Sequence, residues 1–226
     1  MADRSVAVVI PAYQAERFVG AAIESVLDQP CPVDQIVVVD DGSTDRTAAV
    51  ARSFGPPVVV VERPNGGIGA ARNTGVSLVG SELLAFLDAD DLWTRAALES
   101  RLGLFEDPLL DAAFGQVSRF VEIAAGGPVA AGPPLAGQFP TAMLIRRRAF
   151  ERVGAFAEGT AVSEGLDWLL RAQEAGLVTT MVDETVLWRR VHGANNSLLR
   201  RGEIGEYART LKASLDRKRA AREGTP

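Results

Sequence analysis

The sequence predicts an α/β fold, with a mostly parallel central sheet covered by helices on both faces. Short runs rich in Val and Ile alternate with segments whose apolar residues recur at helical spacing. The links between these segments are short. Because parallel strands need crossover connections, which helices usually supply, this alternation indicates a parallel sheet buried on both faces.

The elements of the first half follow one another regularly. Helix 15–29 carries an apolar stripe that includes Phe18 and Ile23, and Gly55 and the two prolines after it end the next helix. Strands are predicted at 5–13, 35–43, 58–63 and 82–91, and helices at 15–29, from a cap at Ser43 or Thr44 to Phe54, and at 67–79.

The second half is less regular. Its Gly-, Pro- and Ala-rich stretch at 124–137 predicts a mobile loop that closes over a bound ligand. The other predicted elements are helices at 94–107, 146–153 and 164–175, strands at 112–123 and 178–192, and a charged helix after Gly202.

Composition limits the class of protein. With 226 residues, 47% hydrophobic and 23% charged, the chain is an ordinary globular one, and we expect a single domain. A net charge of −5 does not favour nucleic-acid binding. One cysteine, Cys31, excludes an intramolecular disulfide, and one histidine, His192, excludes a multi-histidine metal site. No transmembrane run or signal-peptide pattern is present, so the expected location is cytoplasmic.

Two acidic clusters follow predicted strands. Asp40 and Asp41 end one strand, and Asp88, Asp90 and Asp91 end another. In open α/β sheets, ligands bind beyond the carboxyl ends of the strands, so both clusters fall at the expected binding edge. Carboxylate oxygens suit Mg²⁺ or Mn²⁺, with substrate phosphates completing the coordination shell. The alternative is that these aspartates only cap helices and turns.

Other nucleotide and phosphate sites fit the sequence less well. A phospho-receiver domain would have paired acids after its first strand, and a haloacid-dehalogenase-like phosphatase would have DxDx[ST] near its start. No G-x-x-x-x-G-K-[ST] is present. The segment GGIGAAR at 66–72 has Arg72 where a dinucleotide fingerprint needs glycine, and it follows the third strand instead of the first.

Four ordered motifs resemble those of the family 2 glycosyltransferases, which have the GT-A fold of nucleotide-diphospho-sugar transferases. They are VVIPAYQAE at 8–16, VVVDDGSTD at 37–45, NGGIGAARNTG at 65–75 and LDADD at 87–91. A looser similarity continues through GAF at 154–156, the helix at 164–175 and WRRVHGANNS at 188–197. The resemblance implies transfer of a sugar from a nucleotide-diphosphate donor, with Mn²⁺ or Mg²⁺ as cofactor.

The resemblance also implies roles on the donor side. Asp41 corresponds to an acid that contacts uracil, which makes a UDP-sugar the expected donor, and Arg72 to an arginine near the diphosphate. Asp90 would be the direct metal ligand, and His192 corresponds to a histidine that approaches the diphosphate or metal. The remaining implied donor contacts are Pro11, Ala12 and Tyr13, with Tyr13 as a stacking residue, Asp40 beside Asp41, and Asp88 facing the ribose or sugar.

The expected general base is less clear from the sequence. The family usually has a Glu-Asp pair at the start of the helix that here reads SEGLDWLLRAQEAG, and Gly165 occupies the usual Asp position. Glu164 and Asp167 are three apart, on one helical face, so either can reach an acceptor hydroxyl. An acceptor that needs little help and a chain that has lost activity are the other readings.

The sequence therefore predicts an inverting, metal-dependent glycosyltransferase whose acceptor is unidentified. Residues 1–93 would bind the donor, residues 94–200 the acceptor, and 201–226 would form a basic helical tail. Trp188, Arg189 and Arg190 are candidates for the acceptor wall. The tail is either a solvated helix end or a surface for anionic lipid or an acidic partner. Alternatives are a nucleotide-sugar-binding or partner-binding module without turnover and, with less support, a sugar nucleotidyltransferase.

Overall fold

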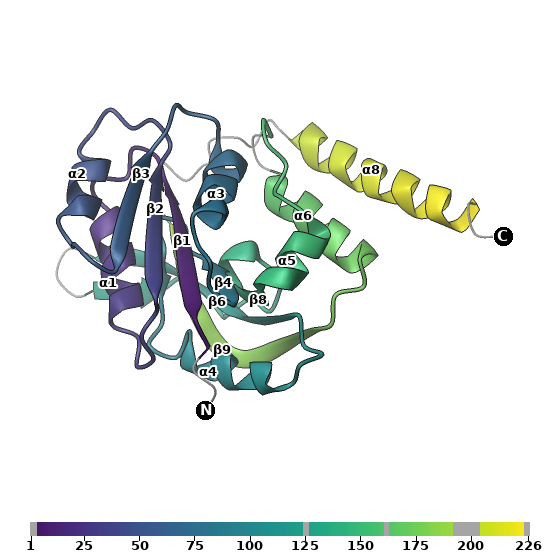
Figure 1. The fold of residues 1–226 in the computed structure, drawn as a ribbon. Coiled ribbons are helices and arrows are strands. Elements are labelled where there is room, and N and C mark those ends of the chain that lie inside the picture. Colours follow the sequence, from purple (N-terminus) through teal and green to yellow (C-terminus); the bar gives the residue numbers. More distant parts are fainter. Residues whose placement is uncertain (1–3, 124–126, 161–162, 192–203, 224–226) are drawn as a thin grey trace.

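The computed structural model describes residues 4–123, 127–160, 163–191 and 204–223. Within these residues nine strands form one sheet, in the order β3-β2-β1-β4-β8-β6-β9-β5, with β7 paired to β6. Helices lie on both sides of the sheet, and α8 lies at the rim of the molecule beside α6 (Figure 1). No helix among the described residues is long and apolar enough to span a bilayer.

The first half forms the predicted parallel sheet. β1, β2, β3 and β4 pair in parallel, and helices connect them, so the carboxyl ends of these strands lie at one edge. The elements are β1 (Val6–Ala12), α1 (Val19–Leu27), β2 (Gln35–Asp40), α2 (Thr47–Arg52), β3 (Val58–Glu62), α3 (Ile68–Ser77) and β4 (Leu83–Phe86).

The second half extends the sheet with mixed pairing. β8 is antiparallel to both β4 and β6, whereas β9 runs parallel to β6. The elements are β5 (Leu92–Trp93), α4 (Glu99–Leu102), η1 (Gly103–Glu106), β6 (Ala112–Ile123), β7 (Gly127–Ala130), η2 (Pro140–Ala142), β8 (Met143–Arg146), α5 (Arg147–Val153), α6 (Glu164–Glu174), β9 (Thr179–Arg190) and α8 (Ile204–Glu223).

The structure differs from the local predictions in five places. The fourth strand ends at Phe86, and the acidic segment after it is a turn, because Asp91 N–H donates to the carbonyl of Asp88. The helix predicted at 94–107 is regular only from Glu99 and becomes a 3₁₀ turn at Gly103. No local pattern in the sequence predicts β8. Part of the predicted loop is β7, which completes a hairpin with β6. The second helix begins at Thr47, after the expected caps at Ser43 and Thr44.

Burial of both sheet faces explains the Val- and Ile-rich strands. Alternate residues of β1 point into two separate apolar cores, Val8 and Ile10 into one, Ala7 and Val9 into the other. The first core is covered by α1 and the second by α3, α5 and α6. A cluster of aromatic rings, in which Trp168 stacks on Phe150 at 5.4 Å, fixes α6 against the second face.

Gly69 in α3 is packed too closely for any side chain. A methyl group at this position would lie 2.2 Å from the carbonyl oxygen of Ala157. We expect Gly69→Ala to lower the free energy of unfolding by about 1–3 kcal/mol, because backbone must move to relieve the overlap. Urea unfolding of the purified protein measures this. Gly103→Ala, where no atom lies within 4 Å, is the matched control and should change stability little. Equal effects of the two substitutions would contradict the packing argument.

Candidate functional site

A cleft of about 330 Å³ lies beyond the carboxyl end of β4, between the turn after that strand, η2, α6 and the first turn of α8. Its charged lining comes from segments that are far apart in the sequence. These side chains are Arg72, Asp88, Asp91, Arg119, Glu164 and Arg189. The cleft therefore brings together groups suited to bind phosphate, a cation and an acceptor hydroxyl.

The turn after β4 concentrates three carboxylates. Oxygen atoms of Asp88, Asp90 and Asp91 all lie within 4.8 Å of one another. Asp91 is buried, and burial, with the negative charges of Asp90 and Asp88, raises the pKa of its carboxyl well above the usual range. A divalent cation relieves this repulsion, and carboxylate oxygen is the donor that Mg²⁺ and Mn²⁺ prefer. The three residues thus fit a metal site.

Arg190 of β9 fixes the acidic turn through two hydrogen bonds. Its backbone N–H donates to Asp91 Oδ1 at 2.9 Å, and its Nε donates to the Asp90 carbonyl at 2.8 Å. The guanidinium packs between the rings of Phe18 and Phe120, at 5.0 and 4.7 Å from their centroids. The position of the acidic turn therefore depends on a contact with the last strand, about a hundred residues away.

Arg72 links the acidic turn after β4 to α6. This buried side chain donates to Asp88 Oδ1 at 2.8 Å and to Glu164 Oε1 at 3.0 Å. It also lies over the Phe156 ring, 5.3 Å from the centroid. The next residue, Asn73, exchanges hydrogen bonds with the backbone of Phe156, which ties the AARN motif to the GAF motif. Arg72 is thus positioned between two of the predicted site carboxylates.

The two candidate bases lie in different surroundings. Glu164 lines the cleft and is bonded to Arg72. Asp167 is ion-paired with Arg171 at 2.8 Å and lies 3.8 Å from Arg217 of α8. It does not line the cleft as delimited within the described residues. Of the two, the structure brings only Glu164 together with the acidic turn.

The Asp40–Asp41 pair organises local backbone. Asp40 Oδ1 accepts from the Ser43 N–H at 3.0 Å. Asp41 accepts from Gly66 N–H at 3.1 Å and from Gly67 N–H at 2.7 Å, and Arg63 lies 3.5 Å from it. These bonds fix the glycine-rich segment that starts α3. The proposed contact of Asp41 with a uracil ring remains a prediction.

The end of β1 leaves an aromatic side chain exposed. Pro11 and Ala12 are buried in the strand, whereas Tyr13 is 56% exposed and thus accessible for stacking. Gln14 follows with a positive φ of 50°, and its side-chain Oε1 accepts from the Thr44 N–H at 3.0 Å. This residue, which the sequence analysis did not select, connects the ends of β1 and β2.

Several other lining residues were also missed. Arg119 of β6 and Tyr207 of α8 line the cleft, and no motif marked them in the sequence. Arg189, predicted for the acceptor wall, does line it. His192, the predicted second metal residue, lies outside the described residues.

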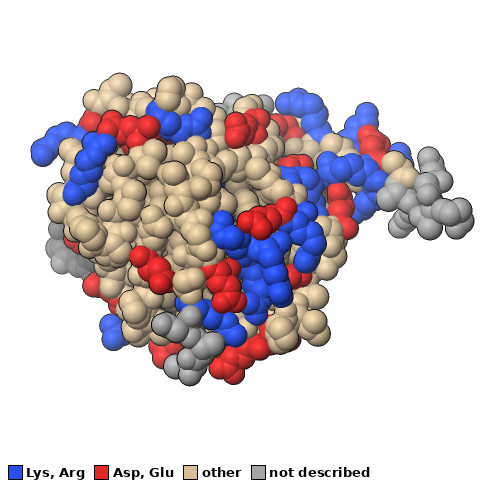
Figure 2. Space-filling model, in the orientation of Figure 1, with Lys and Arg blue, Asp and Glu red and all other residues tan. Residues whose placement is uncertain are grey.

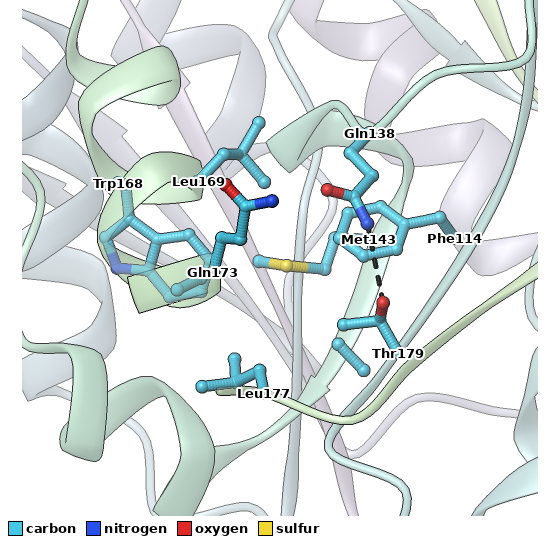
Figure 3. A pocket seen from close by; sticks show the side chains of 10 residues that line it. Phe114, Gln138, Met143, Trp168, Leu169, Gln173, Leu177 and Thr179 are labelled. Carbon is cyan, nitrogen blue, oxygen red and sulfur yellow. Dashed lines mark hydrogen bonds between the residues drawn. The ribbon is translucent and has the colours of Figure 1, made fainter. Parts of the chain in front are cut away.

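A second, smaller cavity of about 190 Å³ adjoins the cleft (Figure 3). Figure 3 shows Met143, Phe114, Trp168 and Leu177 around it, with Gln138 bonded to Thr179. Gln138 and Leu169 line both hollows. Because no charged side chain lines this cavity within the described part of the chain, the polar chemistry belongs to the cleft.

Comparison with known proteins agrees with this geometry. The family model described as "Glycosyl transferase family 2" matches residues 7–154. The chain belongs to this family. The match contains all four motifs that carried the resemblance, and it ends before the helix that bears Glu164 and Asp167.

Two solved structures have a similar fold. TarS residues 1–349 from S. aureus, in complex with UDP-GlcNAc, superimposes with a TM-score of 0.70 at 18% identity, over 85% of this chain and 60% of that one. The mannosyltransferase PcManGT from Pyrobaculum calidifontis, in complex with GDP-Man and Mn²⁺, gives 0.68 at 19% identity, over 87% and 60%. The predicted GT-A fold is therefore confirmed.

Family 2 relatives are longer than this chain. Glycosyltransferase GlyA of Streptococcus pneumoniae is 29% identical over 125 residues, which cover 54% of this chain and 18% of GlyA. The shared part is thus a module of that relative.

Proposed function

We propose that this protein transfers a sugar from a nucleoside-diphosphate donor to a nucleophile on an unidentified acceptor. One observation carries the proposal: Arg72 joins Asp88 of the acidic turn to Glu164 within one cleft. Family membership and the nucleotide sugars bound in TarS and PcManGT support a donor of this class. Residues 1–93 would bind the donor and residues 94–200 the acceptor. The segment that follows β7, of which Leu135 lines the cleft, would close over the donor.

The acidic turn is the proposed cation site. Asp90 is the primary ligand, and Asp88 and Asp91 complete the protein's share of the coordination shell. A divalent cation bound there supplies positive charge to the diphosphate as it leaves. Arg72 adds a second positive charge beside it and orients the Asp88 carboxylate. Mn²⁺ or Mg²⁺ suits this oxygen-rich set.

Glu164 is the proposed general base. Its carboxylate takes the proton of the acceptor hydroxyl while the hydroxyl oxygen attacks the anomeric carbon. The bond from that carbon to the diphosphate oxygen breaks at the same time, and the nucleoside diphosphate leaves with the electron pair. Attack from the opposite side inverts the configuration. On the donor, Tyr13 would stack on the nucleotide base and Asp41 would favour uracil. A UDP-sugar is therefore the proposed donor.

A panel of donors tests the function. Purified protein should gain thermal stability with one class of nucleotide sugar, UDP, GDP or dTDP, and gain more when Mn²⁺ is added. It should also hydrolyse that donor slowly without an acceptor. Stabilisation without any hydrolysis would favour the alternative of a binding module without turnover. Absence of both effects for all donors would refute the proposal.

Gly165, which stands where the family usually has the Asp of a Glu-Asp pair, lies close to Pro140. A side-chain carbon at this position would lie 3.2 Å from Cγ of Pro140 in η2. We expect Gly165→Asp to lower the free energy of unfolding by about 1 kcal/mol, because the contact is tight. Transfer should not become faster, since Glu164 already supplies a base. Urea unfolding and donor turnover measure this, with Gly165→Ala as the steric control. A clear gain in transfer would contradict the assignment of Glu164.

A further inference from the structure

Helix α8 docks on the body through its polar side. Ser163 donates to Glu206 at 2.6 Å, and Thr210 bonds to the same serine at 3.1 Å. One and two turns further on, Ser214 and Arg217 bond to Glu174 of α6 at 2.5 and 2.7 Å. A surface helix normally buries its apolar face against the core, whereas α8 makes these contacts with polar side chains.

Three exposed apolar residues of α8 lie beside the polar side that docks on the body, and the first of them borders the cleft. Tyr207, Leu211 and Leu215 are four positions apart, so they form one row along the helix, here named the α8 stripe. They are 39, 46 and 56% exposed. Exposed apolar rows of this kind mark contact surfaces.

Cations surround the outer end of the α8 stripe. Lys212, Lys218 and Arg219 stand three or four positions from Leu215, on adjacent turns of the helix. Lys218 bonds to Gln173, and Arg219 pairs with Asp216 at 3.9 Å. The helix holds six basic and three acidic residues, although the whole chain carries a net charge of −5. Figure 2 shows many Lys and Arg side chains along the projecting α8.

We propose that α8 binds the surface of an anionic phospholipid bilayer through this stripe. Leu211 and Leu215 enter the boundary between headgroups and acyl chains, and the cations contact lipid phosphates. A second copy of the chain is a poorer occupant, because an α8–α8 contact would bring the two sets of cations together.

The α8 stripe begins at the edge of the cleft, so a bilayer bound to the stripe would lie close to the proposed active site. Tyr207 is both the first residue of the stripe and part of the cleft lining. A bilayer bound along α8 therefore lies at the mouth of the cleft. This last step rests on the proposed function, and it predicts an acceptor presented at a membrane surface. The bilayer contact itself stands without it.

Vesicle flotation of the full chain tests the contact. The protein should float with vesicles of phosphatidylcholine and phosphatidylglycerol, stay behind with phosphatidylcholine alone, and detach in high salt. Leu211→Glu with Leu215→Glu should abolish binding. Lys212→Glu with Arg219→Glu should weaken it by about tenfold or more. Leu109→Glu is the matched control, since Leu109 is 73% exposed on another segment and its replacement should leave flotation unchanged.

Each other outcome overturns the proposal. Flotation with neither kind of vesicle would do so, and so would unchanged flotation of the double-leucine variant, with its folding verified by thermal unfolding. Concentration-dependent dimers that this variant abolishes would assign the α8 stripe to a second copy. Because flotation needs no donor or turnover, its failure is distinct from failure of the proposed transferase activity.

Discussion

Asp90→Asn should abolish the response of this protein to Mn²⁺ and reduce donor turnover by about 10²–10³-fold, the loss expected when a charge-stabilising group is removed. The substitution keeps the shape of the side chain but replaces one of the three carboxyl groups whose oxygens lie within 4.8 Å of one another with a neutral amide. Because the acidic turn then carries less negative charge, it should bind a divalent cation with lower affinity. The wild-type protein, in contrast, should be stabilised by about 2.7 kcal/mol when Mn²⁺ is present at a hundred times its dissociation constant.

Thermal unfolding with and without Mn²⁺, and hydrolysis of the donor selected by the nucleotide panel, measure the two effects of Asp90→Asn. Asp183→Asn is the control, because Asp183 is exposed on β9 and does not belong to the acidic cluster. Chelation with EDTA should reproduce the loss of turnover in the wild type. If Asp90→Asn kept both turnover and the Mn²⁺ shift while Asp183→Asn behaved as wild type, the acidic turn would not be a metal site.

The first half of the fold could be predicted because its signals are local. Uninterrupted Val and Ile runs are typical of parallel strands buried on both faces, and β1 and β2 are such strands. Chemistry at the strand ends follows from topology, since parallel strands place their carboxyl ends at one edge. The sequence alone therefore predicts a binding site at Asp88 and Asp90.

The rest of the fold depends on contacts that no local pattern encodes. β8 is a four-residue strand whose burial comes from β4 on one side and β6 on the other. Arg101 is fully buried, donates to the carbonyls of Ala97 and Ala142, and has its pKa lowered to about 9 by burial. Its environment is created by residues forty positions away.

The choice between Glu164 and Asp167 illustrates the same limit. Spacing places both on one face of a helix, and only tertiary packing separates them. Arg171 and Arg217 engage Asp167, whereas Arg72 engages Glu164 inside the cleft. The residues that decide the matter come from three different helices, α3, α6 and α8.

Glu164→Gln should lower the rate of transfer to acceptor by about 10²–10⁴-fold, the range that general-base catalysis contributes. The amide keeps the length of the side chain and an oxygen that can accept from Arg72, so the Arg72 contact at 3.0 Å has a substitute. The glutamine amide, however, cannot take the proton of the acceptor hydroxyl as a carboxylate does. Donor affinity should remain within a few-fold of wild type, because the acidic turn is unchanged.

Single-turnover transfer separates this loss from a loss of binding, once an acceptor is found. Asp167→Asn is the comparison, since it removes a carboxylate from the same helix at a position paired with Arg171. It should weaken the docking of α6 and α8 slightly and leave the transfer rate near that of wild type. The opposite order, with Asp167→Asn inactive and Glu164→Gln active, would transfer the role of base to Asp167. It would also require α8 to move, since Arg217 of that helix lies 3.8 Å from the Asp167 carboxylate.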